Sequence, residues 1–366
     1  MNAKEEYNTF IDYYYFDYNI MNSIISFFDY SENDAYITSF CIYTVLNSFY
    51  DMNKICIPYS KAHVWDINQG TEKSNQKINI VQKLSKCWFV SEDYNQLNKI
   101  RVDKVDDIYS LFDEELQTMK ELHDIQNVFS PFIEIAFETS IENYKNSECF
   151  SDNLQRMILE IYHEKKIKTI YDLFQFNYKM INILNIKKYI DIDNISSKNV
   201  IQIIESFFDD NLLLKSINIK SISDFKILFY NNLNNFAQSE FSKNVFMYSF
   251  LCDYLGITRE KKEKVYKDTF VSSMINDLIH LSIGLRCHCF ITNDKNLRKK
   301  AVICKNLLDL HTRIFNGDDF YQHLINEYYK YTYNNEDQKE FELKIEINGK
   351  NYSKKLKTDF SKKYYL

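Results

Sequence analysis

Two aspartates follow short apolar runs that resemble strands. Asp17 comes directly after the aromatic residues 13–16. Asp294 comes three residues after the end of the apolar run 287–291. Aromatic and β-branched residues favour strands, and ligands of open α/β sheets sit at the carboxyl ends of the strands. An aspartate after a strand is ordinarily a turn or helix-cap residue, so each of the two has a structural interpretation beside the chemical one.

Two further aspartates lie on predicted helices. Asp277 lies within the apolar sequence MINDLIHL, and Asp66 follows the helix-cap residue Ser60 by six positions. Carboxylates are seldom buried unless they are paired or bind a metal ion, although Asp277 could also form a salt bridge on a helix face. Several aspartate oxygens that meet at one point would suit Mg²⁺ or Mn²⁺.

The elements that must position these carboxylates alternate between strands and helices at both ends of the chain. Such alternation predicts an α/β fold with a central parallel sheet. The spacing of apolar residues predicts strands at 13–16, 54–57 and 287–291, and helices at 20–29, 34–51, 61–68, 262–285 and from 297 onward.

Between the two α/β stretches, apolar residues recur at three and four positions and strand signals are weak. We therefore expect an all-α insertion over 93–254, between core halves at 1–92 and 255–335. The last segment, 336–366, contains two alternating runs on either side of Asn348-Gly349, a strong turn signal that predicts a β-hairpin.

The order of these motifs resembles that of PIN-like nucleases. The resemblance rests on FDYN at 16–19, IPYS at 57–60 followed by Asp66, NDLIH at 276–280 and ITND at 291–294, and it covers roughly 1–90 and 255–315. It implies a PIN-like three-layer core around the central sheet. It also implies a metal-dependent endonuclease that hydrolyses phosphodiester bonds, most often in RNA, with Mg²⁺ or Mn²⁺ held by carboxylates.

The resemblance also implies roles for individual residues. Asp17, Asp277 and Asp294 would bind the metal, while Asp66 would take part in catalysis where the family more often has glutamate. Asn19 and Thr292 would orient the carboxylates. Helix spacing, independently of the resemblance, places His280 on the same face as Asp277, where it is either a supporting group that acts as general base or contacts phosphate, or a partly buried histidine with satisfied hydrogen bonds. Lys295, Arg298 and Lys299 would either follow the nucleic-acid backbone or form a solvated helix face.

Composition narrows the alternatives. With only 5 glycines in 366 residues, the chain contains none of the common glycine-rich phosphate loops and no nucleophile elbow. A formal net charge of −6 argues against indiscriminate binding to nucleic acid but leaves room for a local basic groove. The 8 cysteines include no C-x-x-C pair and are expected to be buried free thiols.

No secretion signal and no membrane-spanning run is recognisable, so we expect a cytoplasmic protein that does not bind membranes. Stand-alone bacterial enzymes of this family often act as toxins or antiviral (anti-phage) effectors, and that role is implied by family alone. Two other hypotheses stay open: a catalytically degenerate binding or scaffold protein, and a nuclease specific for structured DNA. The helical insertion or the C-terminal hairpin could bind a protein partner.

Overall fold

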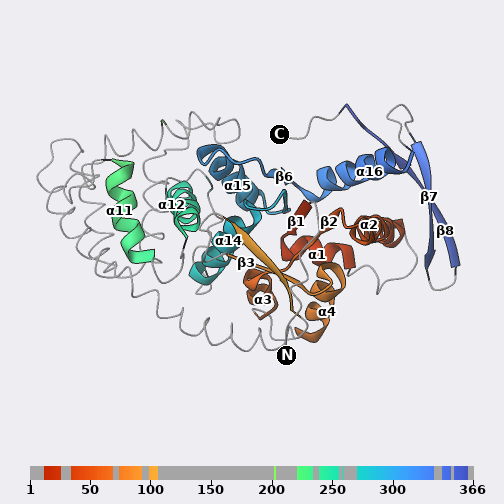
Figure 1. The fold of residues 1–366 in the computed structure, drawn as a ribbon, viewed down its shortest axis with the longest axis horizontal. Coiled ribbons are helices and arrows are strands. Elements are labelled where there is room, and N and C mark those ends of the chain that lie inside the picture. The colour runs from red at the N-terminus through yellow and green to blue at the C-terminus, as the bar shows by residue number, and fades with distance from the viewer. Residues whose placement is uncertain are drawn as a thin grey trace, which may run out of the picture. The chain divides into compact units, whose positions relative to one another are not determined.

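The computed structural model describes residues 12–25, 34–68, 74–92, 99–105, 202, 221–233, 239–254, 258, 270–333, 340–347 and 350–361. The chain divides into two compact units (Figure 1). The first consists of residues 1–115, 279–305 and 309–366, and the second of 116–278 with 306–308. Each unit is described by itself below.

The core of the first unit is a four-stranded parallel sheet in the order β2-β1-β5-β6, which confirms the expected mixed α/β fold with a parallel sheet. Its strands are β1 (Asp12–Phe16), β2 (Ile55–Cys56), β5 (Cys289–Ile291) and β6 (Arg313–Phe315). In register, Phe16 of β1 lies opposite Ile291 of β5, and Ile291 lies opposite Phe315 of β6. The carboxyl ends of β1 and β5 are therefore adjacent at one edge of the sheet.

Both faces of the central strands are buried, as is usual for parallel sheets. The last three residues of β1 and all three residues of β5 are inaccessible or nearly so, which accounts for their continuous apolar and aromatic sequence. Around residue 288 the side chains alternate as expected for a strand, because Cys287 and Cys289 are buried and His288 is exposed. The cysteines in the described ranges are free thiols, and all but Cys87 are buried.

Helices surround the sheet and begin at recognisable caps. The Ser60 hydroxyl accepts a hydrogen bond from the Ala62 amide, at 3.2 Å, at the start of α3. Asn316 caps the start of α16: its Oδ1 accepts a hydrogen bond from the Asp319 amide at 2.7 Å, and its Nδ2 donates to the Asp319 carboxylate at 2.8 Å. The helices of this unit are α1 (Tyr18–Ile25), α2 (Asp34–Asp51), α3 (Lys61–Asn68), α4 (Ser74–Ser85), the end of α14 (Phe270–Gly284), α15 (Lys295–Leu307) and α16 (Gly317–Tyr333).

One expectation for the middle of the chain was wrong. Residues 93–254 are not entirely helical, because β4 (Ile100–Lys104) pairs antiparallel with β3 (Trp88–Glu92). The sequence IRVDK alternates apolar and polar residues with the period of a strand, a signal too short to stand out beside the helical segments around it. In the second unit the structure describes α11 (Ile222–Leu233) and α12 (Glu240–Tyr254), both within the stretch expected to be helical, and most of residues 106–220 lie outside the described residues.

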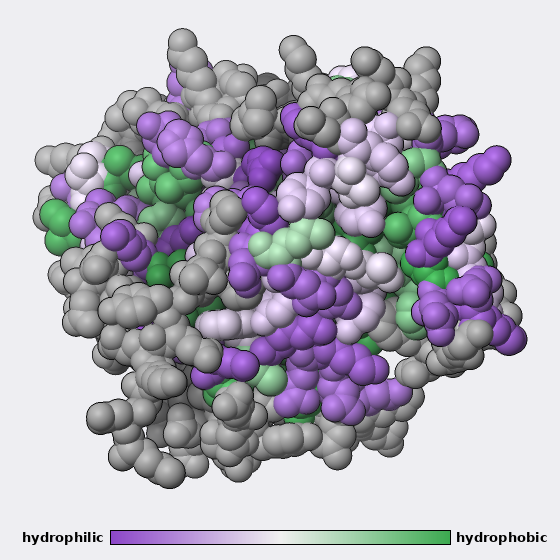
Figure 2. All heavy atoms as spheres, turned by 45° about the vertical axis from the view of Figure 1, so that its right-hand side comes forward, coloured by the Kyte–Doolittle hydropathy of each residue, from purple (hydrophilic) through white to green (hydrophobic). Residues whose placement is uncertain are grey.

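The expected C-terminal hairpin is present as β7 (Glu340–Ile347) and β8 (Lys350–Lys357), which pair antiparallel. Phe341, Leu343, Ile345 and Leu356 of the hairpin are buried, and Phe341 packs against the rings of Tyr328 and Tyr329 of α16. On the exposed face, glutamates of β7 lie opposite lysines of β8, as Glu340 does with Lys357. Figure 2 brings the right-hand side of Figure 1 forward. In that view, hydrophilic side chains cover much of the described surface.

None of the helices in the described ranges is long and apolar enough to cross a membrane.

Candidate metal centre

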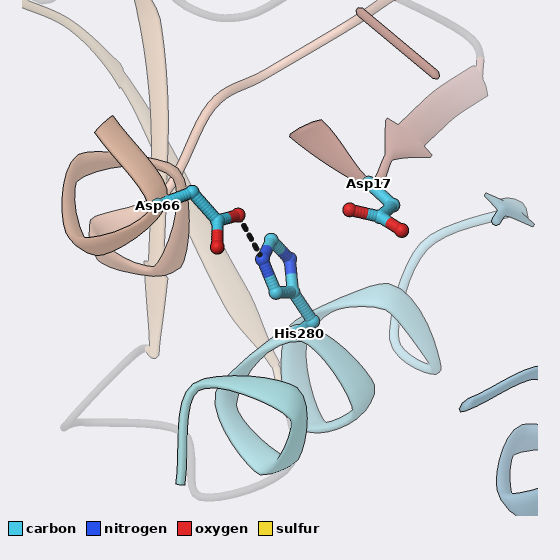
Figure 3. A group of neighbouring side chains, drawn as sticks. All are labelled: Asp17, Asp66 and His280. Atoms are coloured by element: carbon cyan, nitrogen blue, oxygen red, sulfur yellow. Dashed lines mark hydrogen bonds and ion pairs between the residues drawn. The ribbon is translucent and has the colours of Figure 1, made fainter. Parts of the chain in front are cut away.

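Three side chains from distant parts of the sequence converge at the carboxyl edge of the sheet (Figure 3). Asp17 follows β1, Asp66 lies on α3 and His280 lies on α14. Each offers one potential ligand atom, and these atoms all lie within 4.8 Å of one another. Among the described residues, no other group of three or more histidine, cysteine, aspartate or glutamate side chains is arranged to hold a metal ion.

Asp17 is a buried carboxylate with 5% of its surface exposed. The Thr292 hydroxyl donates a hydrogen bond to Oδ2 at 2.9 Å, and the backbone amide of Asn19 donates to Oδ1 at 3.3 Å. Burial raises the pKa of Asp17 and the neighbouring Asp66 raises it further, whereas His280 and the two hydrogen bonds lower it. A cation at this point would favour the ionised form of the carboxyl group.

His280 connects Asp66 to the interior of the protein. Its Nε2 lies 2.9 Å from Asp66 Oδ2, and its Nδ1 lies 2.9 Å from the hydroxyl of Tyr15. The ring is 2% exposed, whereas Asp66 is half-buried. Both ring nitrogens therefore have partners, one on the side of the carboxylates and one in the core of the unit.

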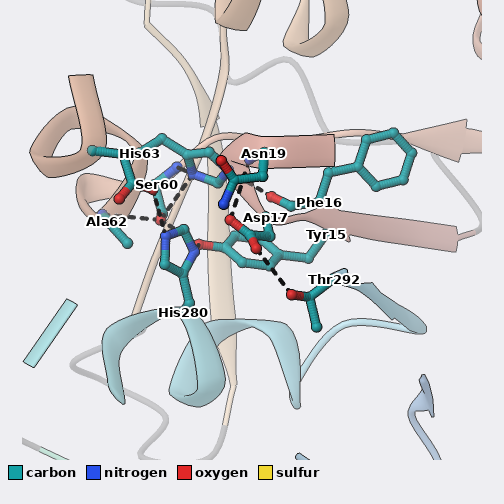
Figure 4. A network of polar contacts seen from close by, with 10 residues as sticks. Tyr15, Phe16, Asp17, Asn19, Ser60, Ala62, His63, His280 and Thr292 are labelled. Carbon is teal, nitrogen blue, oxygen red and sulfur yellow. Dashed lines mark hydrogen bonds and ion pairs between the residues drawn. The ribbon is translucent and has the colours of Figure 1, made fainter. Parts of the chain in front are cut away.

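Behind His280, a chain of buried polar groups continues from Tyr15 through Ser60 to His63 (Figure 4). The Tyr15 hydroxyl lies 2.6 Å from Ser60 Oγ, and Ser60 Oγ lies 3.3 Å from His63 Nδ1. Burial raises the pKa of the Tyr15 phenol well above its usual value and lowers the pKa of His63 well below its usual value. Both groups are therefore neutral near pH 7.

The two other aspartates predicted to bind the metal lie outside the group. Asp294 is exposed, and its Oδ1 accepts the amides of Asn296 and Leu297 at 2.8 and 2.9 Å, so it is the N-cap of α15. Asp277 lies on α14 three residues before His280, in the part of that helix assigned to the second unit, and its side chain is half-buried. Their roles as metal ligands remain predictions.

The residues predicted to support the site contribute in different ways. Thr292 is fully buried and orients Asp17 through its hydroxyl, while Asn19 is exposed and contributes its backbone amide. Arg298 lies on α15 with its guanidinium 3.3 Å from the carbonyl oxygen of Thr292, so it lies beside the edge of the sheet. On the same helix, Lys295 is exposed and Lys299 is half-buried.

The donor set fits a divalent cation. Two carboxylates supply negative charge and hard oxygen ligands, and imidazole nitrogen is a common ligand for first-row transition metals. Sequence reasoning found Asp17 and Asp66 but assigned His280 a supporting role, and it missed Tyr15, Ser60 and His63 as a polar chain. The one available signal was the Ser-x-x-His spacing at a helix start, which places the serine and histidine side chains one turn apart.

No protein-family model, curated protein or solved structure matches this chain.

Proposed function

We propose that the protein is a metal-dependent endoribonuclease. The observation that carries this proposal is the convergence of Asp17, Asp66 and His280 at the carboxyl edge of a parallel sheet, where open α/β folds bind their ligands. The order of the acidic motifs, which resembles that of PIN-like nucleases, supports phosphodiester hydrolysis as the reaction.

In this proposal, the Asp17 and Asp66 carboxylates and the His280 imidazole hold the cation. When bound, a divalent cation supplies a Lewis acid for the phosphate and lowers the pKa of a coordinated water. The Thr292 hydroxyl and the Asn19 amide keep the Asp17 carboxylate in one orientation, so that little rearrangement is needed on binding.

The proposed substrate contacts lie on α15, which begins immediately after the sheet edge. Arg298 is held near the edge by its contact with the Thr292 carbonyl, and exposed Lys295 opens the helix. These cations would attract the phosphates that flank the scissile bond, while the overall charge of −6 limits binding elsewhere.

The proposal is tested with purified protein that has been treated with a chelator and then supplied with Mn²⁺ or Mg²⁺. Labelled single-stranded RNA, tRNA and branched DNA serve as substrates. We expect cleavage of RNA that stops with the chelator and with Asp17→Asn. Asp51→Asn, at an exposed position at the end of α2, is the matched control and should retain activity.

Three outcomes would contradict the proposal. Cleavage confined to branched DNA would favour a structure-specific DNA nuclease. Metal binding without cleavage of any substrate would favour a scaffold protein. Cleavage that survives both the chelator and Asp17→Asn would show that the activity belongs to another site or to a contaminant.

A further inference from the structure

We propose that Tyr15, backed by Ser60 and His63, accepts the Nδ1 proton of His280 when Nε2 binds the cation, and that the centre therefore selects a transition-metal ion such as Mn²⁺ over Mg²⁺. This inference rests on the metal centre of the proposed function, but it concerns the coordination of the ion rather than the reaction.

The argument begins at His63, the buried end of the chain of polar groups. The backbone amide of Ser60 lies 3.0 Å from His63 Nδ1 and can only donate, so Nδ1 accepts. The carbonyl oxygen of Phe16 lies 2.6 Å from His63 Nε2 and can only accept, so Nε2 carries the proton. Two backbone groups thus fix one neutral tautomer of His63, with an acceptor nitrogen facing Ser60.

The groups between His63 and His280 can be ordered in two directions. In one, the Ser60 hydroxyl donates to Tyr15, Tyr15 donates to His280 Nδ1, and His280 Nε2–H donates to Asp66. In the other, His280 Nδ1–H donates to Tyr15, Tyr15 donates to Ser60, and Ser60 donates to the acceptor nitrogen of His63. The observed distances of 2.9, 2.6 and 3.3 Å allow both directions.

The two directions contain the same number of protons, and they differ in which nitrogen of His280 is bare. The first direction suits the metal-free protein, because Nε2–H then faces the Asp66 carboxylate at 2.9 Å. The second leaves the Nε2 lone pair facing the Asp66 carboxylate, which is unfavourable unless a cation lies between them. Binding a cation through Nε2 therefore requires the second direction, and the Tyr15 oxygen is the acceptor that makes it possible.

This arrangement is the one by which proteins usually orient a metal-binding histidine, whose other ring nitrogen donates to a nearby acceptor. Tyr15 is fully buried on β1, so its hydroxyl has no water to replace Ser60 and His280 as partners. Mg²⁺ prefers oxygen ligands and gives up its waters reluctantly. Mn²⁺ also takes oxygen ligands but, as a transition-metal ion, it accepts an imidazole nitrogen more readily than Mg²⁺ does. A centre that can offer the bare Nε2 of His280 therefore favours Mn²⁺ over Mg²⁺.

The first experiment measures binding of Mn²⁺ and of Mg²⁺ to the full chain by calorimetry, with no nucleic acid present. Tyr15→Phe keeps the ring and removes the hydroxyl. We expect the affinity for Mn²⁺ to fall about 10- to 100-fold, while the affinity for Mg²⁺ changes little. The ratio of the two affinities is the decisive quantity, because general loss of structure would weaken both ions. Tyr14→Phe, the neighbouring buried tyrosine of β1, is the matched control.

The second experiment needs no substitution and so does not depend on whether a variant folds. Electron spin-echo spectroscopy of the Mn²⁺-loaded protein should show coupling to one ¹⁴N nucleus. In histidine-labelled protein loaded with diamagnetic Zn²⁺, the ¹⁵N spectrum of the 7 histidines should show His280 protonated at Nδ1. His63 should stay protonated at Nε2 with and without the ion.

The inference would be overturned by Mn²⁺ binding without nitrogen coupling, or by equal loss of both ions in Tyr15→Phe. These outcomes are separate from those that test the proposed function. Nitrogen-coordinated Mn²⁺ in a protein that cleaves no RNA would keep this inference and refute the nuclease. RNA cleavage supported by Mg²⁺, in a protein whose Mn²⁺-loaded form shows no nitrogen coupling, would keep the nuclease and refute this inference.

Discussion

Asp17→Asn offers a direct test of the reasoning about the buried carboxylate. In the metal-free protein, burial and Asp66 raise the pKa of Asp17 above its value in the unfolded chain, which is about 3.9. A carboxyl group with a raised pKa in the folded state stabilises the fold below the unfolded pKa. That stabilisation is lost as the pH rises through the folded pKa.

The magnitude follows from two terms of opposite sign. Each unit by which the folded pKa is raised corresponds to about 1.4 kcal/mol lost by the wild type between low and neutral pH. Asparagine offers one acceptor oxygen where aspartate offers two, so the variant should lose about 1 kcal/mol of hydrogen bonding at any pH. Asp17→Asn should therefore be the less stable protein near pH 4, and its deficit should shrink or reverse by pH 8.

Urea denaturation of both proteins between pH 4 and pH 8, in the presence of a chelator, measures this difference. Contributions from titratable groups that do not interact with Asp17 cancel when the two free energies of unfolding are subtracted. A difference that stays constant across this range would refute the account of Asp17 as a carboxylate buried without a cation. Adding Mn²⁺ at 100 times its dissociation constant should stabilise the wild type by about 2.7 kcal/mol and the variant by much less.

Two further predictions concern stability away from the metal centre. Burial, with a contribution from nearby Arg313, lowers the pKa of His323 from 6.5 to about 4, a change that corresponds to about 3 kcal/mol. That stability is lost as the pH falls from 6.5 to 4, so His323→Gln should flatten the acid limb of the denaturation profile, and an unchanged limb would contradict this. A Cβ on Gly284 would lie 2.6 Å from the buried ring of Phe290, so Gly284→Ala should lower the free energy of unfolding by about 1–3 kcal/mol. Gly317→Ala, whose nearest contact is 3.1 Å, should cost less in the same urea titration, and equal losses would argue against steric crowding.

The sequence was sufficient to predict the parallel sheet and the place of Asp17. Residues 14–16 and 289–291 are continuous apolar or aromatic runs, each followed closely by polar residues, and this is the pattern of central parallel strands. The sequence could not show which polar residue at the end of β5 faces Asp17. Thr292 does so, whereas Asp294 turns outward and caps α15, which is the ordinary role of an aspartate after a strand.

The polar chain behind His280 was hidden for a different reason. In a strand buried on both faces, Tyr14 and Tyr15 look equivalent, because burial pattern alone does not say which ring meets a polar partner. Only the placement of α3 and α14 brings Ser60 and His280 to the Tyr15 hydroxyl. Contacts between residues 15 and 280 depend on tertiary packing, about which local periodicity carries no information.

The separation of the metal-binding side chains along the chain has a consequence for protein synthesis. Asp66 and His280 are 214 residues apart (280 − 66), and joining ends at that distance costs roughly 5 kcal/mol of chain entropy. Until β5 emerges, β1 lacks the neighbour whose carbonyl and hydroxyl groups hold Asp17. A ribosome-bound chain that does not yet include His280 therefore carries the Asp17 and Asp66 carboxylates without the imidazole. The chemistry proposed for the centre would arise only after the residues up to Thr292 have left the ribosome.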